Sequence, residues 1–186
     1  MIGFAFCGSF CTHARAVKAL ENIISMGYEV QPIMSECVYS TSTKFGKSED
    51  LVKRVTDLCG RPVIHTMVDA EPLGPVVGLD ALVICPCTGN TLAKIANGIT
   101  DTSVCMAAKA HLRSDRPLVI ALASNDAMSA NLRNIGTLLS RKFVYFVPLI
   151  QDDPNNKPHS LVADFDVLPQ TLEFALKGAQ YRKLFK

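Results

Sequence analysis

Hydrophobic residues along this chain fall into two alternating patterns, short and mostly apolar runs and longer segments in which apolar positions recur with helical spacing. The runs have the length of strands and lie at residues 2–7, 29–34, 81–85, 118–123 and 144–148. The amphipathic segments have the length of helices and cover residues 12–26, 49–59, 92–99, 102–113 and 131–141. The chain therefore alternates strand and helix along most of its length.

This alternation predicts an α/β fold with a doubly wound, Rossmann- or flavodoxin-like parallel sheet. Runs such as Leu118–Leu122 lack a polar residue at every second position, which fits strands covered by helices on both faces. With 186 residues the chain can bury one full core, and two domains would be cramped. We expect a single domain over residues 1–186, in which residues 151–168 form a substrate-side loop and residues 169–186 a C-terminal helix.

The stretch around Pro86 is the first candidate site. The strand over residues 81–85 is expected to break at Pro86, and Thr88–Thr91 then form a polar turn before the next helix. In an open α/β sheet such a turn lies at the carboxyl end of a strand, where unpaired backbone N–H groups and small polar side chains face a ligand crevice. The same spacing is equally typical of an ordinary capped turn between a strand and a helix.

Three other strand ends carry small polar residues: Gly8-Ser9, Ser35 and Ser124-Asn125. Because parallel strands end at one edge of a sheet, these turns are expected to share that edge with the turn at Thr88. Gly8-Ser9 is not a dinucleotide fingerprint, since the second and third glycines are missing. Such a turn at a helix start can still hold one phosphate through its backbone N–H groups and the Ser9 hydroxyl.

Charge and hydropathy narrow the classes of partner. The net charge is only +2 and no basic stripe is interleaved with aromatic residues, so nucleic-acid binding is not expected. The mean hydropathy is +0.21 without an 18-residue apolar run, which argues against a membrane span. The same positive mean hydropathy leaves surplus apolar surface, which other subunits are expected to cover. The first ten residues lack a basic start and are interpreted as a strand, not a signal peptide.

Seven cysteines are an odd number, and without a secretory signal they are expected to be reduced thiols in a cytoplasm. Cys85 and Cys87 are the only close pair. No second pair of Cys or His residues stands at a zinc-like spacing, so a metal site is not expected.

The turn Pro86-Cys87-Thr88-Gly89-Asn90-Thr91, followed by Leu92-Ala93-Lys94-Ile95-Ala96-Asn97-Gly98, resembles the flavoprotein family of homo-oligomeric, FMN-containing cysteine decarboxylases. That family shows a Pro-Ala-Ser-Ala-Asn-Thr turn before an Ala-Lys-Ile-Ala-Asn-Gly helix. Further matches follow the same order in the chain, at Gly8-Ser9, at Ser35, and at Asn125 with Met128. The resemblance covers roughly residues 1–150 and implies a homo-oligomer built from trimers.

The resemblance also implies an FMN site and names its residues. The cofactor contacts would come from Gly8, Ser9, Phe10, Ser35, Pro86, Cys87, Thr88, Asn90 and Thr91. Helix capping explains each Ser or Thr of this set when it is taken alone. Asn125 and Met128 would face the substrate, with Asn125 also counted as catalytic, although a turn Asn often bonds its own backbone.

Three further residues are candidates for the chemistry. His65 is the only match to the family's catalytic histidine and could act as an acid or base near neutral pH, but an ordinary surface histidine is as consistent with its place. Lys157 and His159 stand in a polar loop that could close over an anionic substrate. The alternative for this loop is an exposed, solvated segment.

Departures from the family pattern change the expected reaction. The later turn, residues 122–129, keeps Asn125 and Met128 but lacks the family's Pro, first Met and Trp, and no Cys follows Pro148. Decarboxylation of a cysteinyl peptide is therefore disfavoured. The resemblance, which extends to the tail Lys157–Ala163, implies instead an oxidation that aromatises a small dicarboxylate. It also implies a larger partner protein, which could carry NAD(P). The alternatives are an FMN-dependent decarboxylase and a non-catalytic binding subunit.

Overall fold

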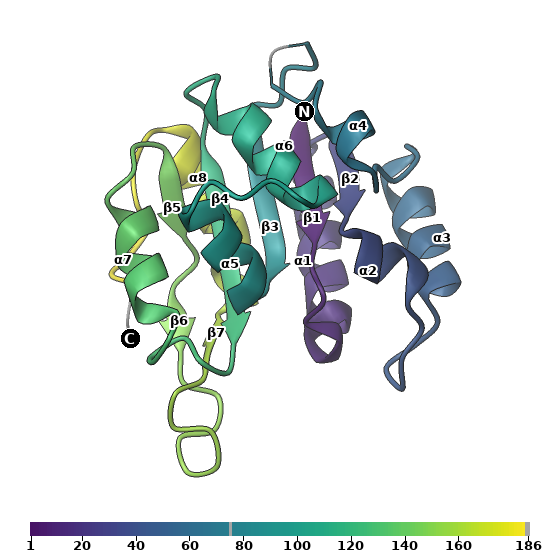
Figure 1. The fold of residues 1–186 in the computed structure, drawn as a ribbon. Helices are drawn as coiled ribbons and strands as arrows, with labels where there is room; N and C mark the ends of the chain where they lie inside the picture. Colours follow the sequence, from purple (N-terminus) through teal and green to yellow (C-terminus); the bar gives the residue numbers. More distant parts are fainter. Residues whose placement is uncertain (75, 185–186) are drawn as a thin grey trace.

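The computed structural model describes residues 1–74 and 76–184, and residues 75, 185 and 186 lie outside the described part. Within these ranges, seven strands form one mixed sheet: β1 Ile2–Phe6, β2 Val30–Met34, β3 Ala81–Cys87, β4 Leu118–Ser124, β5 Val144–Phe146, β6 Leu149–Ile150 and β7 Leu161–Ala163 (Figure 1). The first four are buried along their whole length, as mostly apolar runs predict, and in β2 this burial includes the polar Gln31.

The parallel part of the sheet has the order β2-β1-β3-β4-β5, which is the flavodoxin-like doubly wound order. The outer edge of β4 is shared between two partners. β5 pairs in parallel with Leu118–Ile120, and β7 pairs in antiparallel fashion with Ala123 and Ser124. β6 then pairs with β7. The prediction of a doubly wound parallel sheet is thus confirmed for five strands. The sheet also contains two short antiparallel strands, β6 and β7, which were not predicted.

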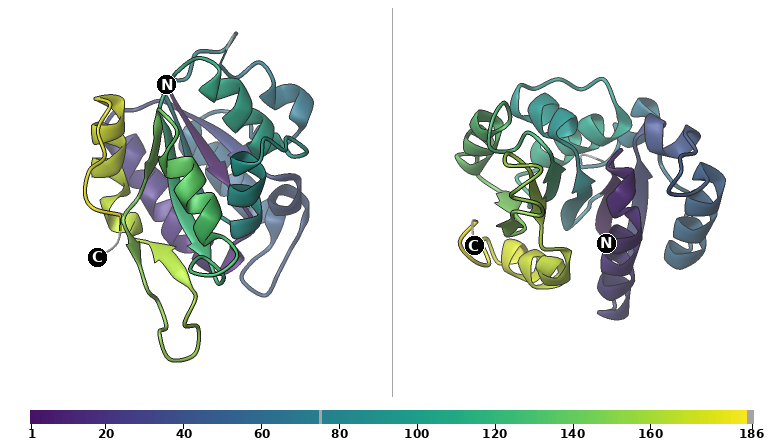
Figure 2. Two further views of the ribbon diagram at one scale, coloured as in Figure 1. Left: turned by 60° about the vertical axis from the view of Figure 1, so that its left-hand side comes forward. Right: turned by 90° about the horizontal axis from the view of Figure 1, so that it is seen from below.

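Helices cover both faces of the sheet (Figure 2). One face carries α1 His13–Ser25 and α8 Leu168–Leu176, which also contact each other, and the short helices η1 Phe10–Thr12 and η2 Phe165–Val167 adjoin them. The other face carries α5 Gly89–Ala96, α6 Ser103–Leu112 and α7 Leu132–Leu139, with α4 Met67–Ala70 packed on α6. At the β2 edge lie α2 Glu36–Ser40 and α3 Ser48–Cys59.

The local sequence explains where several of these elements begin and end. The buried face of α1 consists of Ala16, Val17, Ala19, Leu20 and Ile23. Helix α3 ends at Gly60, whose φ of 62° is a left-handed conformation that glycine adopts without strain. Ser35, Thr66, Thr88 and Thr102 each cap the N-terminus of the helix that follows.

Two predictions of element boundaries were wrong. The strand was expected to break at Pro86, but β3 continues to Cys87. Its pairing with β4 shifts register between Ile84 and Cys87, so that Pro86, which has no backbone N–H, lies within the shift. The helix expected over residues 169–186 ends at Leu176, and residues 177–184 continue without helix. Helix α2 was not predicted.

The segment expected to be a loop, residues 151–168, also holds regular structure. Its first part joins β6 to β7 and projects beyond the carboxyl edge of the sheet, at the bottom of Figure 1. Its second part contains β7 and η2. The projecting part, residues 151–160, is called the hairpin loop below.

Candidate functional site

The switch point of the doubly wound sheet lies at its carboxyl edge, between β1 and β3. These strands are neighbours, yet β1 leads to α1 on one face and β3 leads to α5 on the other. In doubly wound sheets this divergence opens the crevice in which ligands bind. The two turns are joined at their base, because the Cys7 N–H donates to the carbonyl of Pro86 at 3.1 Å.

The turn after β1 is tight and leaves donors free. The Ser9 carbonyl accepts from the backbone N–H of Thr12 at 3.0 Å and from its hydroxyl at 2.8 Å. Among the described residues, the backbone N–H groups of Gly8 and Phe10 have no acceptor. Such unpaired amides at a helix start are suited to an anion. The Ser9 side chain makes no cap bond and is also available.

His13 lies directly behind this turn. Its Nε2 is 2.9 Å from the Cys7 carbonyl oxygen, and its ring packs against Phe6 and Phe10. Burial lowers the pKa of His13, and the hydrogen bond to the Cys7 carbonyl, which acts in the opposite direction, only partly offsets this. We therefore expect a neutral imidazole that braces the turn. His13 was not among the residues predicted from the sequence.

The turn after β3 is built from a helix cap. The Thr91 N–H donates to Thr88 Oγ1 at 3.2 Å, and the Thr88 hydroxyl donates to Thr91 Oγ1 at 3.1 Å. In the described part of the chain, the N–H groups of Gly89 and Asn90 have no acceptor, and the Asn90 side chain is exposed. Cofactor contact by Thr88 and Asn90 thus remains a prediction that the geometry permits.

The other predicted members of this turn point inward. Pro86, Cys87 and Thr91 are buried, so a ligand in the crevice could reach only their backbone atoms. Burial, opposed by a hydrogen bond to Thr91, raises the pKa of Cys7 to about 12. Burial also holds the pKa of Cys87 well above its usual range. Both side chains are therefore protonated, poorly nucleophilic thiols at neutral pH.

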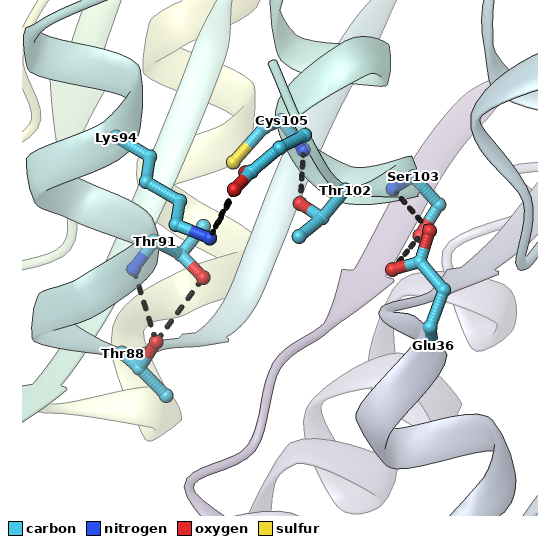
Figure 3. A network of polar contacts seen from close by, with 8 residues as sticks. Glu36, Thr88, Thr91, Lys94, Thr102, Ser103 and Cys105 are labelled. Atoms are coloured by element: carbon cyan, nitrogen blue, oxygen red, sulfur yellow. Dashed lines mark hydrogen bonds and ion pairs between the residues drawn. The ribbon is translucent and has the colours of Figure 1, made fainter. Parts of the chain in front are cut away.

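A network of polar contacts braces this edge from the side of α5 and α6 (Figure 3). Ser35 Oγ accepts from the Val38 N–H at 3.4 Å, and the next residue, Glu36, accepts from the Ser103 N–H at 2.9 Å. The Ser103 hydroxyl donates to the Met34 carbonyl at 2.7 Å. These bonds fix the start of α6 to the end of β2, with Ser35 between them.

Lys94 extends the same network across α5. Its Nζ is 2.9 Å from the carboxylate of Asp101, and the pairing raises the pKa of Lys94 and lowers that of Asp101. The pair is solvent-facing, so it adds little to stability. Its effect is to orient the Lys94 side chain between α5 and α6 (Figure 3).

The turn after β4 meets the hairpin loop. The Met128 N–H donates to the His159 carbonyl at 3.0 Å, and the Ser160 hydroxyl lies 3.5 Å from Asn125 Oδ1. The structure therefore brings together the predicted substrate residues Asn125, Met128 and His159. The side chains of Asn125 and His159 are exposed.

A buried polar cluster, here called the Asp126 cluster, joins this turn to the one after β3. Asn131 Nδ2 is 2.9 Å from each oxygen of Asp126, and the Ser124 hydroxyl donates to the same carboxylate. Asn131 Oδ1 accepts from Asn134 at 2.9 Å. A Cβ atom on Gly89 would lie 2.4 Å from Ser124 Oγ and 2.6 Å from Asn131 Nδ2. Only glycine fits this position without a shift of its neighbours.

The Ser124 and Asn131 hydrogen bonds lower the pKa of Asp126, so the cluster holds a carboxylate at neutral pH. Its residues, like Glu36 and Ser103, were not selected by the sequence analysis. The one available signal was the density of Ser, Asn and Asp over residues 124–134.

His65 lies apart from this assembly. It follows Ile64, which bridges to Ile33 beyond the β2 edge, and its ring stacks on Tyr39 with centroids 3.6 Å apart. Three strand spacings separate β2 from β4, and Ile64 lies a further spacing out, so His65 and Asn125 are on the order of 19 Å apart. Within one chain the two predicted catalytic residues do not meet.

Lys157 pairs with Asp152 inside the hairpin loop, with Nζ 3.5 Å from Oδ2. Nearly half of its side chain is exposed. In the ranges that the structure covers, no cluster of His, Cys, Asp and Glu is arranged to hold a metal ion. No helix of these ranges is long and apolar enough to cross a membrane.

Comparison with known proteins gives a consistent result. The sequence model of the Flavoprotein family matches residues 1–164. The B subunit of dipicolinate synthase from Bacillus subtilis (strain 168) is 45% identical over 98% of this chain and 92% of its own length. The crystal structure of the dipicolinate synthase B subunit from Bacillus halodurans has 41% identity and a TM-score of 0.91, covering 100% of this chain and 95% of that one. The FMN-dependent cysteine decarboxylase SpaF shares the fold, with a TM-score of 0.66 and 24% identity over 94% of this chain and 95% of its own.

Proposed function

This chain belongs to the flavoprotein family, and we propose that it is the B subunit of a dipicolinate synthase that binds FMN at the carboxyl edge of its sheet. One observation carries the proposal. At the carboxyl ends of β1 and β3, the backbone N–H groups of Gly8 and Phe10 on one side and of Gly89 and Asn90 on the other have no acceptor among the described residues. The identity of 45% to the B. subtilis protein supports the same reaction.

The residues at this edge suit FMN. A phosphate needs N–H and O–H donors, and Ser9 with the Gly8 and Phe10 amides would supply them, because none of these groups has an acceptor within the described chain. Ser35 and Thr88 end the strands on either side and would hold the ribityl hydroxyls.

FMN, when bound, supplies an acceptor for the hydride that leaves a dihydropyridine dicarboxylate as the ring becomes aromatic, and NAD(P) on the larger A subunit is the alternative acceptor. The substrate ring loses one hydride and one proton in this oxidation. Hydroxytetrahydrodipicolinate would first lose water.

The chain's own residues would bind and orient the dicarboxylate. The exposed Asn125 amide would donate to a carboxylate, and Ser160 beside it limits its motion. Lys157 and His159 in the hairpin loop would add positive potential over the same place. Since His65 lies far from Asn125 in one chain, a catalytic role for it would require the Asn125 of a neighbouring copy.

Exposed apolar residues support assembly with other subunits. Val68 on α4 and Val76 nearby are 77% and 80% exposed, which is unusual for large aliphatic side chains. We propose a homo-oligomer, a trimer or a multiple of it, in contact with the A subunit of dipicolinate synthase. The site of action would be the cytoplasm of the mother cell in a spore-forming bacterium.

The test is an assay of dipicolinate formation by this chain alone, by the isolated A subunit, and by the pair, with and without FMN. We expect full turnover from the pair and a large loss with Asn125→Ala, whereas the exposed Asn155→Ala serves as the matched control. The proposal would be contradicted if the A subunit, without this chain, reached the rate of the pair.

The same assay separates the alternatives. A non-catalytic binding protein would raise the activity of the A subunit without any dependence on added FMN. An FMN-dependent decarboxylase would release CO₂ from a carboxylate substrate, which the altered turn at residues 122–129 and the lack of a later Cys disfavour.

A further inference from the structure

A second pocket lies at the opposite end of α5 from the crevice. It has a volume of about 210 Å³ and lies between the end of α5, the segment 98–100, helix α6 and Arg141, which follows α7. Its apolar lining includes Ile95, Ile99 and Leu112. None of its residues is among those proposed above to hold FMN or substrate.

Three cationic side chains line this pocket: Lys109, Arg113 and Arg141. Within residues 1–74 and 76–184, none of the three has an ion-pair or side-chain hydrogen-bond partner. Other exposed cations of the described chain, such as Lys18, Lys47 and Lys142, also have no ion-pair partner, but they do not line this pocket. Lys109, Arg113 and Arg141 differ from those cations because they line one pocket together.

The three charges have the same sign, and an anion bound in the pocket would offset their mutual repulsion. Lys109 and Arg113 are four residues apart on α6, so they share one face and repel each other. The carbonyl end of α6 favours Lys109 and Arg113, and Arg141 stands directly after the carbonyl end of α7, so the helix ends help to gather the three cations at this pocket.

We propose that this pocket binds a compact organic dianion, such as two carboxylates on a small ring. The guanidinium groups of Arg113 and Arg141 are suited to bidentate contact with carboxylates. The apolar lining suits a hydrocarbon body, which a bare inorganic ion does not have. The volume is below that of pockets for drug-sized molecules, so the ligand is of metabolite size.

This inference does not depend on the proposed function, because the pocket and the crevice share no proposed ligand residue. Gly89 at the crevice and Ile95 at the pocket are about 9 Å apart along α5. Helix α5 therefore connects the two places.

The experiment is titration calorimetry of the full-length protein at low ionic strength, with pyridine-2,6-dicarboxylate as probe. The double variant Arg113→Gln/Arg141→Gln should bind roughly tenfold or more weakly, because two charge-assisted contacts are lost. The control Lys18→Gln removes an exposed cation on α1 and should leave the affinity unchanged. Inorganic phosphate should bind at least roughly tenfold more weakly than the dicarboxylate.

The double variant Lys157→Gln/His159→Gln distinguishes binding of the dicarboxylate in the crevice from binding in this pocket. If this variant loses the dicarboxylate while Arg113→Gln/Arg141→Gln keeps it, the proposal is wrong. Equal affinity for phosphate would also overturn it, because the apolar lining would then have no part in binding. A third result would also overturn the proposal. If the wild type binds no dicarboxylate and the Arg113→Gln/Arg141→Gln variant dissociates into smaller assemblies, the pocket is a contact between copies of the chain.

Discussion

The turns after β3 and β4 adjoin each other at one edge of the sheet, yet they are held in different ways. The turn after β3 has a complete helix cap at Thr88, with Cys87 and Thr91 buried beneath it. The turn after β4 presents an exposed Asn125 and is tied to the hairpin loop by one backbone bond, from Met128 to His159. The first turn is fixed by its helix cap. In the second turn the Asp126 cluster fixes the backbone, and the exposed Asn125 and the hairpin loop can change with little effect on the core.

This difference matches the pattern of likeness to the family. Residues 86–91 keep the Pro, Asn and Thr of the family motif, whereas residues 122–129 lack the family's Pro, first Met and Trp. Under the proposed function, a rigid turn for the shared cofactor and an adjustable turn for the substrate would let one fold serve several reactions. The Asp126 cluster, which abuts Gly89, is the point where the two turns are locked together. The predictions below test that lock and then each turn.

The largest effect is expected from Gly89→Ala. The new Cβ would clash with Ser124 Oγ and Asn131 Nδ2, and overpacking of this kind costs about 2–3 kcal/mol in the free energy of unfolding. Urea denaturation followed by circular dichroism measures the loss. The control is Gly136→Ala on α7, where a Cβ meets nothing within 4 Å and helix propensity should make the change neutral or stabilising by about 0.5–1 kcal/mol. Equal effects of the two variants would show that Gly89 is not packed as described.

Asn90→Ala tests the rigid turn directly. The side chain is exposed at the start of α5, so the fold should keep its melting temperature, while the affinity for FMN should fall roughly tenfold through the lost polar contact. Fluorescence titration of flavin gives the dissociation constant. The exposed Asn155→Ala is the matched control, and an unchanged constant in Asn90→Ala would remove this residue from the site.

Asp126→Asn tests the lock through its pH dependence. The pKa of Asp126 is lowered from 3.8 by the Ser124 and Asn131 hydrogen bonds, so its contribution to stability is present above about pH 4 and is lost as the pH falls through the lowered pKa. Because the group is partly exposed, we expect a loss of only about 1 kcal/mol at pH 7.

The gap in unfolding free energy between wild type and Asp126→Asn should close on acidification. Urea titrations at pH 7 and pH 3 measure it, with the exposed Glu173→Gln on α8 as the control. A gap of the same size at both values would mean that the carboxylate charge has no part in the cluster.

The smallest effect is expected from Lys157→Gln in the adjustable region. Its ion pair with Asp152 is exposed, so stability should change by less than about 1 kcal/mol. The KM for the dicarboxylate should rise a few-fold with kcat nearly constant, because a charge that attracts the substrate acts on binding. Lys142→Gln, which removes another exposed cation, is the control, and a fall in kcat alone would argue against a role in binding.

Much of this architecture could be predicted from the sequence, since apolar runs such as Leu118–Leu122 fix the parallel strands and Gly60 marks a helix end. The continuation of β3 through Pro86 could not, because it depends on a register shift against β4. The β6–β7 pair also escaped prediction, since β6 has only two residues and gains its partner from the far end of a loop.

The site was predictable where residues act locally and not where they act across the fold. Thr88 and Ser35 lie at strand ends, as predicted, because a helix cap stands beside the strand that it follows, and their contact with a cofactor stays a prediction. Asp126 and Glu36 were missed because their partners, Asn131 and Ser103, are brought to them by packing of separate elements. The distance between His65 and Asn125 likewise follows only from the strand order.

The measurement that tests the central claim most directly is the visible absorption spectrum of the purified protein after incubation with FMN and removal of the excess by desalting. We expect retained flavin bands at about one FMN per chain, with loss of those bands in Asn90→Ala. Absence of retained flavin, both for the chain alone and for its complex with the A subunit, would contradict the assignment of the crevice to this cofactor.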